Sequence, residues 1–376
     1  MRVLYDGVIY RIQKYGGVVR YFNDLIHHLP ASVHPILLAP NCPAVPPTHP
    51  NLSTFIETCE SILWPIKPLR KKIIARRSYN RILREKPDVI HPTYYYSSLR
   101  NLNQRIKTPT VLTVYDLIHE RFPAQMDPYG KQVKLKKMAL ERADAIICIS
   151  ESTKADLQKY YRIPDERITV IHLGCEFNAI QNPPEAAERP YLLYVGERNF
   201  YKNFERTAEA FAKVHQAHPE LQLRCIGGQE FSAAENRMFH EHGIQDSITR
   251  AGHIEDGLIQ KVYAQAVAVV YPSLYEGFGI PILEGMTCGT PVLTSNRSSM
   301  PEVAGDAAIL FDPYSCDQIA EAMMAVVEDA GLRQRLIEAG RKRAQSFSLT
   351  KSANATLEVY QSVSGKTSRQ KSGVAA

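Results

Sequence analysis

The sequence predicts an α/β protein with two domains, each built on a doubly wound parallel sheet. The chain has 376 residues, and at about 100–200 residues per domain two domains are expected. Short β-branched runs alternate with amphipathic stretches, and this alternation stops and starts again in the second half of the chain. The interruption is a polar segment, residues 176–190, with two adjacent prolines, which is typical of a linker.

Ten short apolar runs are predicted to be buried parallel strands, because each is nearly continuous in apolar residues and is bounded by turn-forming ones. The first domain holds residues 1–7, 34–40, 88–92, 110–116 and 144–150. The second domain holds residues 191–197, 221–228, 266–272, 290–296 and 307–313. Helical segments are expected between them.

The domain boundaries follow from this pattern. The first domain is predicted to cover residues 1–175 and the second residues 191–346, with the linker between them. A last helix is predicted at 347–363. The tail, residues 364–376, has few apolar residues to bury and is expected to be mobile.

Composition excludes several classes of protein. A hydrophobic fraction of 44% and a charged fraction of 22% are ordinary for globular domains and exclude disorder or fibrous repeats as the main state. No apolar run approaches the roughly 18–20 residues of a membrane span, and the first residues do not have the pattern of a secretory signal. The seven cysteines lie far apart without a CxxC pair, so a reduced, cytoplasmic compartment is expected.

The net charge of +6 is unevenly distributed. Residues 1–187 hold 26 Lys and Arg against 17 Asp and Glu, while the remainder holds 19 against 22. Residues 64–86 alone hold nine basic residues and one acidic residue, with apolar residues at helical spacing. This basic helix is expected either to contact an anionic membrane surface or to pack its apolar face on the first sheet. No nucleic-acid reader motif accompanies it, so nucleic acid is not an expected partner.

A glycine-rich segment follows the third predicted strand of the second domain, at a carboxyl end, where open α/β sheets bind ligands. Gly277 and Gly279 allow a tight turn and offer backbone N–H groups. Pro281 suits the first position of a helix, which would place Glu284 in its opening turn. Glu276 and Glu284 could then face one crevice, and carboxylates suit the hydroxyl groups of sugars and ribose.

Two cations follow the first predicted strand of the second domain. Arg198 and Lys202 lie on a strand-to-helix loop, and Asn203 suits the N-cap of the next helix. A helix N-terminus flanked by two cations favours phosphate and could neutralise a diphosphate leaving group. In the first domain, Gly16 and Gly17 open a predicted helix and offer backbone N–H groups in the same way.

Other ligand motifs are missing from the sequence. The dinucleotide motif GxGxxG would require a glycine where Ile282 stands. There is no Asp-x-Asp, which argues against a diphosphate bridged by a metal. We therefore expect neither a metal nor another cofactor.

With these motifs, the chain resembles glycosyltransferase family 4, whose members have the GT-B architecture of two Rossmann-like domains facing a cleft. The resemblance covers nearly the whole chain and is most specific at residues 273–313, with further matches at 146–157, 191–211 and 347–361. It implies a retaining, metal-independent enzyme whose final helix, residues 347–363, crosses back to the N-terminal domain.

The resemblance also implies roles for individual residues. Arg198 and Lys202 would hold the donor diphosphate, Glu276 would contact the hydroxyl groups of the donor sugar, and Glu284 would bind the ribose. Backbone N–H groups of Phe278 and Gly279 would assist. The full donor-binding set is Gly16, Gly17, Arg198, Lys202, Glu276, Gly277, Phe278, Gly279, Ile280 and Glu284.

One segment departs from the family pattern. Many relatives carry His-Asp-Leu after the fourth strand, whereas this chain has Tyr115, Asp116 and Leu117 there. His119 could reach the crevice in place of the missing histidine, or it could simply pack locally. The expected catalytic residues are Glu276, Arg198, Lys202, His119 and Asp116.

The expected function is the transfer of a hexose from a nucleotide sugar to a saccharide or lipid-linked saccharide during surface polysaccharide or lipopolysaccharide synthesis. Residues 5–22 resemble O-antigen mannosyltransferases, so GDP-mannose is the first expected donor, with UDP- and dTDP-sugars open. The expected location is the cytoplasm, at the inner face of the membrane if the basic helix binds it. The alternatives are a nucleotide-sugar epimerase or phosphorylase of GT-B architecture, and a basic membrane- or nucleic-acid-binding protein.

Overall fold

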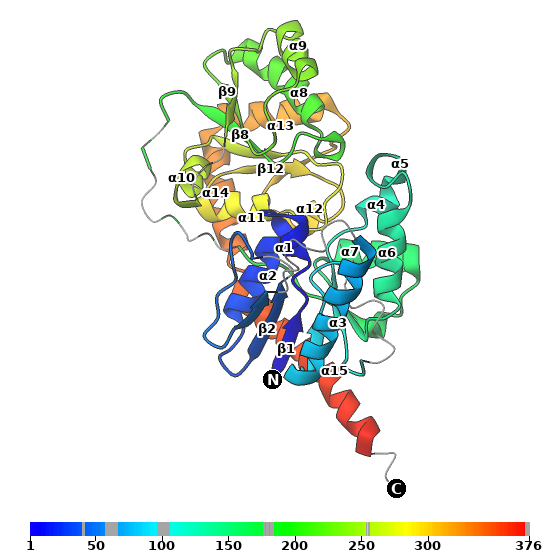
Figure 1. The fold of residues 1–376 in the computed structure, drawn as a ribbon. Helices are drawn as coiled ribbons and strands as arrows, with labels where there is room; N and C mark the ends of the chain where they lie inside the picture. The colour runs from blue at the N-terminus through cyan, green and yellow to red at the C-terminus, as the bar shows by residue number, and fades with distance from the viewer. Residues whose placement is uncertain are drawn as a thin grey trace. The chain divides into compact units, whose positions relative to one another are not determined.

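A computed structural model of the chain describes residues 1–39, 42–56, 67–95, 106–175, 177, 180, 184–185, 187–252, 254 and 256–372. The chain divides into two compact units (Figure 1). Unit 1 consists of Met1–Leu173 and Leu349–Ala376, and unit 2 of Gly174–Ser348. The boundary near residue 174 lies close to the predicted end of the first domain at residue 175. Residues 176, 178–179, 181–183 and 186 of the predicted linker lie outside the described residues.

Unit 1 contains a four-stranded parallel sheet of order β3-β2-β1-β4 and a three-stranded parallel sheet of order β5-β6-β7. A parallel bridge between Ile90 and Thr110 connects the two sheets. The strands are β1 (Arg2–Tyr5), β2 (His34–Ala39), β3 (Ser53–Ile56), β4 (Val89–His91), β5 (Val111–Val114), β6 (Ala145–Cys148) and β7 (Ile168–Val170). The five predicted strands of the first domain are all present, and β3 and β7 are additional edge strands.

The longest helices of unit 1 follow these strands. They are α2 (Gly17–His28), α3 (Lys67–Glu85), α6 (Lys131–Leu140), α7 (Glu151–Tyr161) and α15 (Leu349–Ser372). Three shorter helices are α1 (Ile9–Ile12), α4 (Ile118–Arg121) and α5 (Pro123–Met126). The α7 helix begins where the Ser150 hydroxyl accepts the backbone N–H of Thr153 at 3.0 Å, an ordinary N-cap.

The final helix belongs to unit 1 (orange to red in Figure 1), where α15 packs against α2, β4 and β6. Its buried side chains include Ala353, Thr356 and Tyr360. The helix does not end at Val363, as the sequence pattern predicted, but continues to Ser372. Residues 364–372 of the predicted mobile tail are therefore helical, and their mobility stays a prediction; residues 373–376 lie outside the described residues.

The predicted basic helix is present as α3, although residues 64–66 lie outside the described residues. Ile82 is buried in a cluster with Leu4, Ile36, Leu38 and Ile90, so this part of α3 packs on the first sheet. Its neighbour Leu83 is 53% exposed. The predicted packing face is thus confirmed around Ile82, while contact with a membrane surface stays a prediction.

Unit 2 is built on one six-stranded parallel sheet of order β10-β9-β8-β11-β12-β13. Its strands are β8 (Tyr191–Val195), β9 (Gln222–Ile226), β10 (Ile248–Ala251), β11 (Ala268–Tyr271), β12 (Val292–Ser295) and β13 (Ile309–Phe311). All five strands predicted for the second domain are present, and β10 is an additional edge strand. The strand order reverses between β8 and β11, and this switch point is where open α/β sheets bind ligands.

Helices flank the sheet of unit 2. They are α8 (Phe204–Ala217), α9 (Ala233–Glu241), α10 (Asp256–Ala264), α11 (Ile280–Cys288), α12 (Met300–Ala304), α13 (Cys316–Glu328) and α14 (Ala330–Ala344). The core between them contains Phe204 and Phe211 of α8 and Met323 of α13, all nearly or completely inaccessible to solvent.

Candidate functional site in unit 2

Two residues of opposite charge follow the two strands at the switch point of unit 2 and form an ion pair. Lys202 ends a short 3₁₀ helix (Phe200–Lys202) after β8, and Glu276 follows β11. The Lys202 Nζ donates a hydrogen bond to the Glu276 Oε1 at 2.6 Å, and each side chain is 14% exposed. In the sequence these two residues belong to separate motifs, and the structure brings them together as a largely buried pair with no net charge.

Tyr271, the last residue of β11, is the third member of this group. Its hydroxyl lies 3.4 Å from the Lys202 Nζ, and it is 3% exposed. Burial, followed by the nearby Glu276 carboxylate, raises the pKa of Tyr271 well above its ordinary value. The tyrosine therefore stays protonated beside the pair. Sequence reasoning did not give it a role, although it directly precedes the glycine-rich segment.

Two serines form hydrogen bonds with the backbone of the loop that contains Glu276. The Ser298 hydroxyl accepts the backbone N–H of Glu276 at 2.9 Å and donates to its carbonyl at 2.8 Å. The Ser299 hydroxyl donates to the carbonyl of Phe278 at 2.8 Å. Both serines follow β12, the neighbour of β11. The run of small polar residues after that predicted strand was the signal that could have found them.

Gly279 gives the loop its conformation. Its φ is +113°, and a Cβ atom there would lie 3.1 Å from the Ile282 side chain, so a residue other than glycine would be strained. Gly279 is the N-cap of α11, which begins at Ile280. Gly277, by contrast, does not have a positive φ.

The position of Glu284 in α11 corrects one expectation. Because α11 begins at Ile280, one residue before Pro281, the first turn of this helix contains no acidic residue. Glu284 instead lies deeper in the helix and is 5% exposed. The Tyr263 hydroxyl of α10 donates a hydrogen bond to the Glu284 Oε2 at 2.5 Å. Tyr263 is fully buried and was not identified from the sequence.

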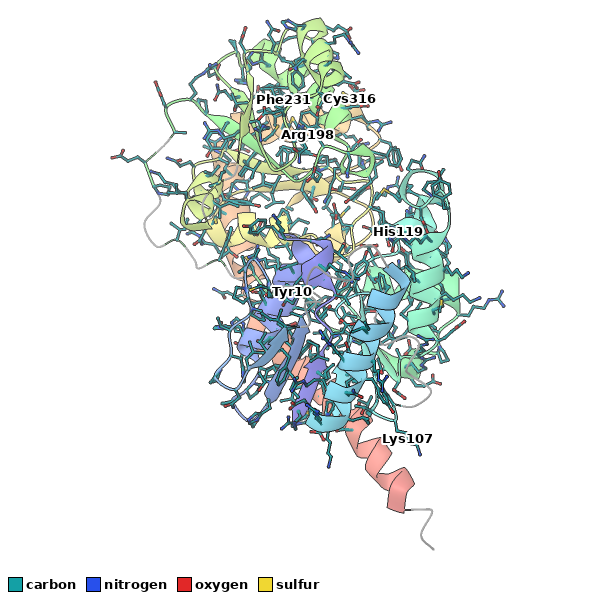
Figure 2. The ribbon with its side chains drawn as sticks, in the orientation of Figure 1. Tyr10, Lys107, His119, Arg198, Phe231 and Cys316 are labelled. Atoms are coloured by element: carbon teal, nitrogen blue, oxygen red, sulfur yellow. The ribbon has the colours of Figure 1, made fainter. Side chains whose placement is uncertain are left out.

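Arg198 has a set of protein partners that the sequence did not predict. Its Nε donates to the Glu235 Oε1 at 2.6 Å, and its side chain is 6% exposed. Its terminal nitrogens donate to the carbonyls of Gly227 at 3.2 Å, Gln229 at 2.5 Å and Glu230 at 3.2 Å. The guanidinium also lies 4.6 Å from the centre of the Phe231 ring, and Figure 2 shows these two residues together in unit 2.

Asn203 is the N-cap of α8, as predicted, but it does not act through a capping hydrogen bond. It has a φ of +60°, and its side-chain amide donates to the carbonyls of Pro272 at 3.2 Å and Pro313 at 2.7 Å. Asn203 therefore connects the start of α8 to the chain after β11 and β13. Asparagine tolerates this left-handed conformation better than most residues.

The predicted residues of unit 1 lie at the carboxyl ends of its strands. Gly16 is the N-cap of α2 and Gly17 its first residue, as the glycine pair predicted. Gly16 has a φ of +153°, and a Cβ at Gly17 would meet no atom within 4 Å. A Cβ at Gly16, by contrast, would lie 2.5 Å from the side-chain oxygen of Gln13, so this helix start is open at Gly17 but covered at Gly16.

The segment after β5 holds Tyr115, Asp116 and His119 (Figure 2 labels His119). The Asp116 carboxylate accepts the backbone N–H of Ile118 at 3.1 Å. Within the described part of the chain, the buried Tyr115 hydroxyl and the buried Nδ1 of His119 have no hydrogen-bond partner. Burial is the main cause that lowers the pKa of His119, so its neutral form is favoured.

Neighbouring side chains fix this segment. The buried Lys136 donates to the backbone carbonyl of Asp116 and to the Glu120 carboxylate, both at 2.8 Å. The Tyr161 hydroxyl donates to the other Glu120 oxygen at 2.5 Å. His119 thus lies between Asp116 and Glu120, which other side chains hold in place. Both roles considered for it, reaching the crevice and packing locally, stay predictions.

The described residues hold no cluster of three or more His, Cys, Asp or Glu side chains suited to a metal ion. What unit 2 does offer is a buried cation, two carboxylates and backbone N–H groups at the start of a helix. Such a set can bind a ligand that combines a phosphate with hydroxyl groups.

Two family models match consecutive parts of the chain. The model described as "Glycosyltransferase Family 4" matches residues 15–178, and the model described as "Glycosyl transferases group 1" matches residues 176–343. Together they cover residues 15–343, in both units, and include every site residue predicted above.

Curated relatives show the same similarity. The chain is 29% identical over 234 residues to O-antigen chain mannosyltransferase B of Escherichia coli, covering 59% of this chain and 61% of that protein. It is 26% identical to a glycogen synthase of Mycobacterium tuberculosis over 96% of this chain and 94% of that one. The chain thus spans less than two thirds of the length of the mannosyltransferase.

Solved structures share the fold. A sucrose-phosphate synthase from Thermosynechococcus elongatus has a TM-score of 0.80 at 23% identity, covering 96% of this chain and 98% of that one. WaaG, a glycosyltransferase involved in lipopolysaccharide biosynthesis, has a TM-score of 0.71 at 17% identity, covering 96% and 99%. These neighbours have GT-B folds, so the predicted fold class, two parallel-sheet α/β domains of GT-B type, is confirmed.

Proposed function

Because the chain belongs to the family 4 glycosyltransferases, we propose that it transfers a hexose from a nucleotide sugar to a saccharide or lipid-linked saccharide. The observation that carries this proposal is the Lys202–Glu276 pair at the switch point of unit 2. The first donor to test is GDP-mannose, because the similarity to O-antigen chain mannosyltransferase B favours a mannosyl donor. UDP- and dTDP-sugars remain the alternatives.

In this proposal, donor binding breaks the Lys202–Glu276 ion pair and gives each side chain a new partner in the donor. The diphosphate takes the charge of Lys202, and Glu276 is released to accept hydrogen bonds from the sugar hydroxyls. After the exchange, Lys202 compensates charge on the diphosphate, and the Glu276 carboxylate is held by hydrogen bonds from neutral hydroxyl groups. Ser298 keeps the backbone of Glu276 in place while the partner of its carboxylate changes.

The nucleoside is proposed to lie along α11, with Glu284 as the acceptor of ribose hydroxyl hydrogen bonds. Tyr263 orients the Glu284 carboxylate for this contact. The backbone N–H groups of Phe278 and Gly279, at the start of α11, are proposed to assist at the sugar or diphosphate.

The proposed chemistry is displacement with retention of configuration. The bond between the anomeric carbon and the diphosphate oxygen breaks, and the diphosphate leaves with the electron pair. The acceptor oxygen forms the new bond on the same face, and its proton passes to the departing phosphate oxygen. Lys202 neutralises the growing charge, so electrostatics and positioning supply the catalysis, and we propose that no metal is required.

Unit 1 is the proposed acceptor-side domain, and its proposed functional residues are Gly16, Gly17, Asp116 and His119. For a lipid-linked acceptor, the basic α3 helix would hold the enzyme at an anionic membrane surface of the cytoplasm. No helix among the described residues is both long and apolar enough to cross a bilayer.

The proposal is tested by a transfer assay with GDP-, UDP- and dTDP-hexoses and saccharide acceptors, with and without EDTA. We expect a product that keeps the donor's anomeric configuration, in amounts that EDTA does not reduce. Glu276→Gln should lower kcat by about 10²-fold or more, while Lys202→Met should also raise the donor KM. Conversion of donor without acceptor, or only with free phosphate, would favour the epimerase or phosphorylase alternative.

A further inference from the structure

The hydrogen-bond donors of Arg198 are largely occupied by other groups of the protein. Four hydrogen bonds leave its guanidinium, one to Glu235 and three to backbone carbonyls of residues 227–230. Guanidinium groups carry five N–H donors, so little capacity is left for a ligand. An arginine that turned toward a diphosphate would have to release all of these acceptors in a site where it is 6% exposed.

The partner of Arg198 is itself fixed. Glu235 forms a capping box at the start of α9: its Oε2 accepts the backbone N–H of Ser232 at 2.7 Å, and the Ser232 hydroxyl accepts that of Glu235 at 3.2 Å. The pKa of Glu235 is lowered, since the hydrogen bonds from Ser232 and Arg198 outweigh the opposing effect of burial. Glu235 is therefore ionised and would be left as an uncompensated charge if Arg198 moved.

The loop that Arg198 holds packs closely on the loop that carries Lys202. Gly227 and Gly228 have φ values of +89° and +71°. A Cβ at Gly228 would lie 2.8 Å from an Arg198 nitrogen, and one at Gly227 would lie 3.2 Å from the Gly196 carbonyl oxygen. A Cβ at Gly196 would in turn meet the Lys202 side chain at 3.8 Å. The backbone N–H of Gly196 donates to the carbonyl of Ile226 at 2.9 Å, so the loop that carries Arg198 and Lys202 is also joined to the end of β9 through the backbone.

We propose that Arg198 is a positioning residue. It ties the loop after β9 to the loop after β8, and so sets the place of Lys202, without touching the diphosphate. This inference rests on the proposed function for the role of Lys202, and it reassigns the second cation of the sequence prediction. The planar guanidinium is required because a lysine ammonium cannot donate to Glu235 and three carbonyls in this geometry.

The first test is a double-mutant cycle on nucleoside diphosphate binding. Arg198→Met, Glu235→Gln and the double variant are measured by calorimetry with GDP, UDP and dTDP, with Lys213→Met as a surface control. Each single variant should weaken binding about tenfold, and the double variant should be no weaker than Arg198→Met. Additive losses, or unchanged binding in Glu235→Gln, would overturn the proposal.

A second variant distinguishes direct contact with the phosphate from positioning of the loop. Arg198→Lys should bind the diphosphate as weakly as Arg198→Met. The lysine keeps the positive charge but lacks the planar set of N–H donors of the guanidinium. Recovery of most of the affinity in Arg198→Lys would indicate direct contact with phosphate and contradict the proposal.

A readout without ligand keeps this inference distinct from the proposed function. In the free protein, Arg198→Met should increase amide hydrogen exchange in residues 227–235 while α13 stays protected. Unchanged exchange in that loop would refute the positioning role. If the wild-type chain binds no nucleoside diphosphate, the proposed function fails, whereas the exchange result still decides whether Arg198 holds the loop.

Discussion

At the scale of residues, the candidate site is made of charges that already have partners. Lys202 is paired with Glu276, Arg198 with Glu235, and Glu284 accepts a hydrogen bond from Tyr263. Buried charges without partners are costly, so a polar site that must also be stable is expected to satisfy its groups before a ligand arrives. In the proposed function, ligand binding exchanges the partners of Lys202 and Glu276, whereas Arg198 keeps its own.

The Tyr263–Glu284 contact gives a prediction about ribose. Tyr263→Phe removes the hydroxyl but keeps the ring beside Phe177. We expect a loss of about 1–3 kcal/mol in the free energy of unfolding, because the buried Glu284 carboxylate loses a donor. The variant should also lose most of the preference for GDP over its 2′,3′-dideoxy analogue, measured by calorimetry. An undiminished preference would show that Tyr263 does not orient Glu284 for ribose.

The residue types of the site were readable from the sequence, but their partners were not. Glu276 and Lys202 stand out because each follows a recognisable strand. Tyr263 and Glu235 lie on helices whose pairing with the site depends on tertiary packing, and no local pattern reports it. The role of Arg198 was predicted from its charge and loop position, and those two properties do not reveal that the side chain turns toward the β9 loop.

At the scale of elements, the ten predicted strands are all present, and three further strands at sheet ends were not predicted. Central parallel strands are covered on both faces, so they read as continuous apolar runs. The three additional strands, β3, β7 and β10, lie at the ends of their sheets. Ser53–Ile56 alternates between partly buried and exposed residues, so it lacks that signature.

The attachment of α15 depends on a buried polar network. The Tyr360 hydroxyl lies 2.6 Å from the Nδ1 of His91 in β4 and 3.1 Å from the Tyr5 hydroxyl in β1. The Nε2 of His91 lies 2.9 Å from the Thr113 hydroxyl in β5. Complete burial lowers the pKa of His91 to about 3, so this ring stays neutral in the folded chain.

The His91 network predicts a pH dependence of stability. Since the folded pKa is about 3 and the ordinary value 6.5, the unfolded chain takes up the proton first as the pH falls. Stability is therefore full above pH 6.5 and declines from there toward pH 3. Between pH 7 and pH 5, His91 should account for a loss of about 2 kcal/mol in the free energy of unfolding.

The measurement compares urea unfolding of the wild-type chain and His91→Gln at the two pH values. Only the change with pH is compared, because the substitution alters stability at both. The variant should lose about 2 kcal/mol less than the wild type on acidification. Equal losses would mean that His91 takes up its proton in the folded chain as easily as in the unfolded one.

At the scale of the whole molecule, the chain forms two parallel-sheet units, and the last helix returns to the first of them. Each unit reverses its strand order once, between β1 and β4 in unit 1 and between β8 and β11 in unit 2. Predicted site residues follow those strands or their neighbours in both units. The sequence was sufficient for this organisation because the linker prolines and the restart of the strand pattern are local signals.

The central claim is that the switch point of unit 2 binds the diphosphate of a nucleotide sugar. The most direct measurement is a thermal-shift series on the full chain with GDP, UDP, dTDP and their sugar conjugates, with and without EDTA. At a ligand concentration of a hundred times its Kd, binding should stabilise the protein by about 2.7 kcal/mol. We predict a shift that is selective for one base, survives EDTA and disappears in Lys202→Met. No shift with any nucleotide, or an equal shift in Lys202→Met, would contradict the account.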